Sequence, residues 1–234
     1  MAAILKATPD RPDFNGVGDD NEEDTLHATG RLSASAEARA ATVVFQLERM
    51  RPDAFAHARR VAAYAVRVAR HAHFPEHLVL QIYWGALVHD VGELNVAPSL
   101  LQRQPALDER AQSEVTRHTT VGARWLSGVP GLATLVPFAR WHHERFDGLG
   151  YPDGATAQQV PLTVALVGVC DTLDDLVEPR SPQVPLSLGD ALAELQDQAG
   201  RRFSRALVTW TVECLEEEDE VDLESLADLD TEPS

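Results

Sequence analysis

Hydrophobic residues recur every three or four positions along most of this chain, which is the spacing that places them on one face of a helix. The clearest stripe runs from Asp53 to Ala72, where Val61, Ala65 and Val68 share one side. The same reasoning predicts helices over about 33–50, 53–72, 76–93, 108–126, 131–141, 161–171, 187–199 and 203–215. We expect Ser33 or Ser35 to cap the first of them and Pro137 to kink the fifth.

The segment 161–171 also fits a buried strand, because it is apolar and rich in β-branched residues. We favour a buried helix, since no other segment of the chain offers a strand to pair with it. The predicted fold class is therefore all-α.

Histidine and aspartate interrupt the apolar faces of these helices. His57 lies on the stripe of the second helix, with Asp53 one turn earlier, and the alternative to a metal ligand is a hydrogen-bonded core histidine. His89 and Asp90 close an apolar helix, where a buried carboxylate is costly unless a cation compensates it. The alternative for Asp90 is a cap on the next turn.

Three further positions carry the same residue types. His118 faces inward on its predicted helix, Asp171 ends another, and His142 and His143 precede a loop rich in glycine. Neighbours on a helix diverge by about 100°, so the adjacent pair is expected to face two different ions. The alternative is a chance His-His pair at a frayed helix end.

Taken together, the candidate ligands are too many for one ion. A zinc site uses three or four protein ligands, so this set predicts two ions, and nitrogen and oxygen ligands suit iron or manganese as well as zinc. Two adjacent ions can clamp a phosphoryl group during hydrolysis. The set consists of His57, His89, Asp90, His118, His142, His143 and Asp171.

The net charge of −17 is concentrated at the two ends of the chain. Residues 1–35 hold three basic and seven acidic side chains, residues 213–234 hold eleven acidic and no basic ones, and the remainder is nearly balanced. We expect a disordered acidic segment at 1–33, a helical domain at 34–212 and an acidic tail at 213–234. This balance argues against binding a nucleic-acid polymer but permits a small anionic ligand.

Two cysteines provide no disulfide framework and suit a reducing compartment. The first residues do not form a secretory signal, and no apolar run approaches the roughly 20 residues that span a bilayer. We therefore expect a cytoplasmic protein without membrane contacts.

At these residues the chain resembles the HD-GYP family of HD metal-dependent phosphohydrolases. The likeness covers roughly 53–210 and is carried by the motifs His57, His89-Asp90, His118 with Gly122, His142-His143-Glu144, Asp147-Gly148-Leu149-Gly150-Tyr151-Pro152, and Asp171 with Asp174. It implies a helical bundle that holds two or three iron or manganese ions and hydrolyses cyclic di-GMP through pGpG towards GMP, or a related cyclic dinucleotide. It also implies that Asp53 joins a third ion.

Two departures from the family pattern concern phosphate binding. Glu93 stands where the family usually has a lysine, and Gln183 replaces the second of two later cations, while Arg180 retains the first. Lys6 is the only lysine of the chain. We expect Asp90, Asp171 and Glu93 to serve catalysis, and Arg180 and Arg145 to hold phosphate in a substrate site that includes Gly150, Tyr151 and Pro152. Glu93 either adds a metal ligand or repels the substrate, and in the second case Glu93→Lys raises turnover.

Two functions follow from the resemblance. The leading prediction is a metal-dependent cyclic-dinucleotide phosphodiesterase whose activity is weakened by Glu93 and Gln183. The alternative is a degenerate receptor or adaptor that binds a partner such as a GGDEF-type cyclase through the loop Gly150-Tyr151-Pro152. The complete ligand set favours the first, and the missing cations favour the second.

Overall fold

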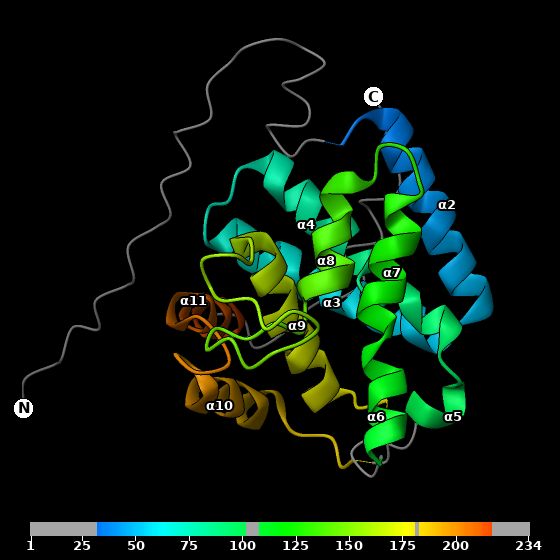
Figure 1. The fold of residues 1–234 in the computed structure, drawn as a ribbon. Helices are drawn as coiled ribbons and strands as arrows, with labels where there is room; N and C mark the ends of the chain where they lie inside the picture. The colour runs from blue at the N-terminus through cyan, green and yellow to red at the C-terminus, as the bar shows by residue number, and fades with distance from the viewer. Residues whose placement is uncertain (1–31, 102–107, 181–182, 217–234) are drawn as a thin grey trace, which may run out of the picture.

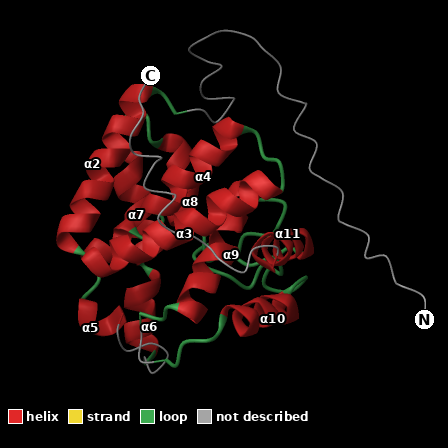
Figure 2. Ribbon diagram, turned by 180° about the vertical axis from the view of Figure 1, so that it is seen from behind, coloured by secondary structure: helices red, strands yellow, loops and turns green. Residues whose placement is uncertain are grey.

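The computed structural model describes residues 32–101, 108–180 and 183–216, which fold into a bundle of helices (Figure 1). No strand forms among these residues, where Ala199 and Phe203 make an isolated bridge (Figure 2). The elements are α2 (Ala34–Met50), α3 (Pro52–His71), α4 (Glu76–Val88), η1 (Val91–Asn95), α5 (Pro98–Leu101), α6 (Glu109–Thr116), α7 (His118–Ser127), η2 (Ala133–Leu135), α8 (Val136–Trp141), α9 (Leu162–Val177), α10 (Leu188–Gln198) and α11 (Arg205–Glu216). The all-α prediction is confirmed.

Helix α3 lies at the centre of the bundle and packs against α2, α4, α9 and α11 (Figure 1). Its inner stripe is rich in alanine, and Ala58, Ala65 and Ala69 are fully buried. Small side chains at helical spacing let neighbouring helices approach closely. His57 shares this stripe, so the packing that buries α3 also carries an imidazole into the interior.

Three helix starts were predictable from local sequence. Ser33 accepts a hydrogen bond from the backbone N–H of Ala36, and Asp108 and Ser187 cap α6 and α10 in the same way. Such caps stabilise a helix by about 1 kcal/mol because they satisfy N–H groups that have no partner within the helix.

Two predicted helices are interrupted in the structure. The helix expected over 76–93 ends at Val88, and the chain turns at His89-Asp90 into the short 3₁₀ helix η1. The helix expected over 108–126 divides at Arg117 into α6 and α7, where the Arg117 N–H to Ser113 C=O bond lengthens to 3.3 Å. The two breaks lie next to each other in space, because η1 and α7 pack together although they are distant in sequence.

Two other boundaries also differ from the prediction. Pro137 stands in the first turn of α8 rather than in the middle of a longer helix, a position where its missing N–H costs no hydrogen bond. Helix α9 confirms the helical interpretation of 161–171 but continues to Val177, which places Asp171 in the helix interior rather than at its end.

The predicted tails lie largely outside the described residues, which begin at Leu32 and end at Glu216. Helix α11 continues through Glu213 to Glu216, beyond the proposed domain boundary at 212. None of the helices in the described part of the chain combines the length and apolar character that crossing a membrane requires.

Candidate metal centre and its cavity

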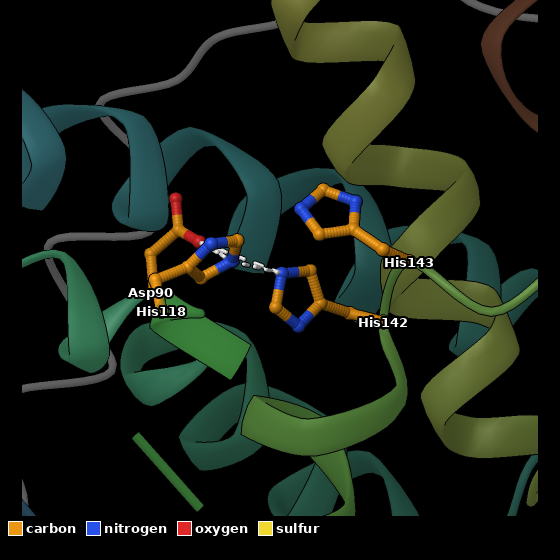
Figure 3. A group of neighbouring side chains, drawn as sticks. All are labelled: Asp90, His118, His142 and His143. Carbon is orange, nitrogen blue, oxygen red and sulfur yellow. Dashed lines mark hydrogen bonds and ion pairs between the residues drawn. The ribbon is translucent and has the colours of Figure 1, made fainter. Parts of the chain in front are cut away.

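Five histidines and two aspartates from distant parts of the sequence gather between α3, α7, α8 and α9. Asp90, His118, His142 and His143 form one group whose ligand atoms all lie within 4.8 Å of one another (Figure 3). His57, His89 and Asp90 form a second such group. Both groups share Asp90, so the candidate ligands surround two neighbouring positions.

Backbone carbonyls fix the orientation of three of the imidazoles. The Nδ1–H of His89 donates to the Ala86 carbonyl at 2.7 Å, and His118 and His142 donate in the same way to Val115 and Phe138 at 2.8 Å. A neutral imidazole that donates from Nδ1 carries its lone pair on Nε2. These three Nε2 atoms face the shared carboxylate, with Asp90 oxygens 3.4–3.5 Å away.

The Nε2 atoms lack suitable hydrogen-bond partners. The buried Nε2 of His89 has none among the described residues, and the Nε2 atoms of His118 and His142 lie 3.2 Å apart. Burial lowers the pKa of His118 to about 4, so its Nε2 bears no proton at neutral pH. A donor set of this kind fits a divalent cation, which satisfies several lone pairs at once.

The carboxylates around the second group also favour a positive charge at this position. Burial and the charge of Arg180 oppose protonation of His57, but its hydrogen bonds to Asp171 and Asp174 raise its pKa to about 9. Burial is likewise outweighed at His89, whose pKa is raised by the charge of Asp90. Both shifts show that the carboxylates favour positive charge at or near these imidazoles, which a divalent cation would supply.

Asp171 lies at the base of this arrangement. Its Oδ1 is 3.0 Å from His57 Nε2 and 3.5 Å from His89 Nε2, and its Oδ2 is 3.9 Å from His143 Nδ1. Asp171 therefore contacts imidazoles of both groups, as Asp90 does. The adjacent residues His142 and His143, which were expected to face different ions, both offer a ligand atom to the first group.

Asp174 has a supporting position that sequence reasoning left unassigned. Its Oδ2 accepts from His57 Nδ1 at 2.7 Å, and Arg60 donates to both carboxylate oxygens at 2.7 and 2.9 Å. The pair orients the imidazole of His57 so that Nε2 points towards Asp171. The sequence contained one signal for this role: Asp174 lies three residues after Asp171, just under one helical turn, and so on the same face of the helix.

Like Asp171, the acidic candidates Asp53 and Glu93 lie outside both ligand groups. Asp53 is bound by Arg51 at 2.9 and 3.1 Å and its side chain is 55% exposed. Glu93 is buried between Arg180, at 3.2 Å from both carboxylate oxygens, and Arg51, at 3.4 Å. Burial and the charge of Asp90 raise the pKa of Glu93 to about 7, while the two guanidiniums act in the opposite direction.

A cavity of about 600 Å³ opens onto these residues. His143, Gly150, Tyr151 and Asp171 line it, and Tyr151 lies with its ring centroid 4.8 Å from that of His143. Gly150 is required because a side chain there would come within 2.5 Å of the backbone at Glu144 and Arg145. Pro152 follows in the loop but does not line the cavity among the described residues.

Glu144 braces this loop rather than binding in the cavity. Its carboxylate accepts hydrogen bonds from the backbone N–H groups of Asp153 at 2.7 Å and Ala155 at 2.9 Å. Asp153 in turn is bound by Arg140 and Trp141 at 2.7 Å. These bonds hold the glycine loop against the end of α8, close to His142 and His143.

Four arginines line the cavity, of which the sequence analysis named Arg145 and Arg180. It missed Arg51 and Arg202, which come from other segments and belong to no motif. Only the folded chain brings these guanidiniums to the same cavity.

A sequence profile for the HD domain matches residues 44–207, about 70% of the chain. The chain belongs to the HD domain family. One relative is a cyclic di-GMP phosphodiesterase of Thermotoga maritima, which is 31% identical over 65% of this chain and 42% of its own length. Another is the 3′3′-cGAMP-specific phosphodiesterase 3 of Vibrio cholerae, which is 29% identical over 62% of this chain and 32% of its own length. The resemblance to the HD-GYP family is confirmed.

The solved structures agree with this HD domain assignment. Bd1817, an HDG"Y"P protein from Bdellovibrio bacteriovorus, superposes with a TM-score of 0.60 at 17% identity, over 82% of this chain and 63% of its own. At that identity the match shows the shared fold. The HD domain described here spans less than half the length of the two curated relatives.

Proposed function

We propose that this HD domain is a metal-dependent phosphodiesterase that hydrolyses cyclic di-GMP through pGpG towards GMP. The observation that carries the proposal is the convergence of buried imidazole nitrogens on Asp90 beside a cavity lined by arginines. The relatives that are phosphodiesterases of cyclic dinucleotides support the substrate class. The cavity volume of about 600 Å³ falls in the range of small-molecule sites.

The metal ligands in this proposal are His57, His89, Asp90, His118, His142, His143 and Asp171. When bound, two divalent ions supply an activated water at neutral pH and neutralise phosphate charge. Nitrogen and oxygen ligands suit iron or manganese. Asp90 and Asp171 each lie close to several of the histidines, so both carboxylates would help to hold the two ions, and Asp171 also lines the cavity.

Arginines on the cavity wall bind the substrate. Arg180 donates to Glu93 and Asp90, which places its guanidinium directly beside the ligand groups. Arg145 lies at the glycine loop, paired with Asp147. Each guanidinium is planar and matches two phosphate oxygens, so exchange of a carboxylate for substrate phosphate positions the scissile bond. Tyr151 forms the wall beside His143.

The proposal is tested by anaerobic assay of the full chain with Mn²⁺ or Fe²⁺ against cyclic di-GMP and 3′3′-cGAMP. We expect turnover that chelation abolishes, and loss of at least 100-fold in Asp171→Asn, because the carboxylate charge is required. Asp197→Asn, at an exposed position on α10, is the matched control and should retain full activity. Metal-loaded protein that turns over neither substrate would refute the proposal.

Two observations favour the second candidate function, a receptor that binds without hydrolysis. Arg180 is engaged by two carboxylates, so substrate phosphate must compete with Glu93 and Asp90 for it. The loop next to Gly150-Tyr151-Pro152 exposes Phe146 and Leu149, the latter by 77%, which offers an apolar surface to a protein partner such as a GGDEF-type cyclase. Binding of a purified cyclase that is lost in Leu149→Asp would support this alternative.

A further inference from the structure

The four arginines that line the cavity differ in what already holds them. Three are paired with carboxylates: Arg51 with Asp53 and Glu93, Arg145 with Asp147, and Arg180 with Glu93 and Asp90. An anion that binds to any of these three must displace a negatively charged partner. Such an exchange returns little free energy, because one charge-assisted contact replaces another.

Arg202 is the exception. Within residues 32–101, 108–180 and 183–216 it makes no ion pair, and its guanidinium donates to two neutral atoms, Thr172 Oγ1 at 3.0 Å and Gln198 Oε1 at 3.4 Å. It also packs over the ring of Phe203, 4.9 Å from the centroid. Burial lowers the pKa of Arg202, whereas a carboxylate partner raises that of Arg60. An arginine remains protonated in either case.

The backbone fixes Arg202 beside the proposed catalytic centre. The N–H of Phe146 donates to the Arg202 carbonyl at 2.9 Å, and the N–H of Asp147 donates to the Arg201 carbonyl at 3.0 Å. These bonds tie the turn between α10 and α11 to the glycine loop. The side chain of Arg202 lines the same cavity as Tyr151 and Asp171.

We propose that Arg202 is the principal protein cation that binds a phosphate group of the cyclic dinucleotide. It fulfils the role that the family pattern assigns to cations at the positions of Glu93 and Gln183, and the inference rests on the proposed function. A phosphate approaching Arg202 displaces only two neutral acceptors. The planar guanidinium then presents parallel donors to two phosphate oxygens.

The test compares Arg202→Ala, Arg202→Lys and the control Arg201→Ala. The Arg201 side chain is 67% exposed and pairs with Asp197 at 3.0 Å, so its loss leaves the cavity unchanged. Steady-state kinetics of the metal-loaded full chain give KM and kcat, and calorimetry of the same metal-loaded chain with a non-hydrolysable phosphorothioate analogue of cyclic di-GMP gives Kd. We expect Arg202→Ala to raise KM and Kd by about 10-fold or more with kcat changed less than about threefold.

Arg202→Lys should recover part of the affinity, because it restores the charge but not the paired donors. Unchanged KM and Kd in Arg202→Ala, or a loss confined to kcat, would overturn the role of Arg202 alone. If the wild type binds the ligand without turnover, the proposed function is overturned. The Kd values of the wild type and Arg202→Ala would then still decide the role of Arg202. Wild-type protein that neither binds nor hydrolyses the ligand would overturn both.

Discussion

Glu93 shows how one residue alters the charge balance of the cavity. Where the family pattern places a lysine, this chain buries a carboxylate against Arg180 and Arg51. The sequence predicts that Glu93→Lys raises turnover, but the structure gives a different expectation. A buried ammonium would face two guanidiniums, and the repulsion would destabilise the fold rather than improve substrate binding.

Glu93→Gln is the informative substitution at this site. It keeps the shape and the acceptor oxygen but removes the charge that competes with phosphate for Arg180. We expect KM for cyclic di-GMP to fall by about 3- to 10-fold, in keeping with the partial release of one charge-assisted contact. The measurement is steady-state kinetics at matched metal content.

The control for this prediction is Glu76→Gln. Glu76 forms an exposed pair with Arg70 at 3.4 Å, and its side chain is 75% exposed. The Glu76→Gln variant should therefore have the KM of the wild type. A KM for Glu93→Gln equal to or above that of the wild type would show that Glu93 does not restrain Arg180.

At the scale of elements, the approach of η1 to α7 brings Asp90 to His118. Gly92 makes this possible, because a Cβ at that position would lie 1.9 Å from the His118 carbonyl oxygen and 2.7 Å from the Gly122 N. The two backbones are therefore in direct contact, and separating them would displace Asp90 or His118, two of the proposed metal ligands. His118 Nε2 lies 3.4 Å from Asp90 in this arrangement.

Gly92→Ala should separate η1 from α7. We expect the variant to lose metal from the group that contains His118 and to be destabilised by about 1–3 kcal/mol, which is typical of overpacking. Metal analysis and urea unfolding measure the two effects.

The matched substitution is Gly189→Ala in the first turn of α10, where an added Cβ meets nothing within 4 Å. It should retain all metal and equal or exceed the wild-type stability by up to about 1 kcal/mol. Full metal retention in Gly92→Ala would contradict the importance of this contact.

The elements also show which features the sequence could predict. Helix starts at Ser33, Asp108 and Ser187 depend on neighbours along the chain, so their local pattern was sufficient. The segment that follows the break after Val88 packs closely at Gly92 against His118, which lies 26 positions further along the chain, and no local pattern predicts this approach.

The same distinction applies to the candidate site. The histidines stood out because polar residues interrupt apolar stripes, and their places on predicted helices indicated that they face inward. Arg51 and Arg202 gave no such signal, since arginines at helix ends and turns are ordinary surface residues. Their significance comes from the cavity alone, which requires the three-dimensional arrangement.

At the scale of the whole molecule, the helices of the HD domain serve to hold charged and polar ligands in an apolar interior. Buried imidazoles and carboxylates on this scale are costly without a compensating cation. Helix α3, which carries His57, and helix α9, which carries Asp171, also contribute buried apolar residues to the core. The divalent metal pair proposed above would, when bound, contribute to the stability of the whole domain as well as to its chemistry.

The direct test of this central claim is the metal content of the full chain purified without oxygen, measured by mass spectrometry of the eluted ions. We predict about two iron or manganese ions per chain, and clearly fewer in Asp90→Asn, because Asp90 belongs to both ligand groups. Wild-type protein that contains less than about 0.2 ions per chain after loading would contradict the account.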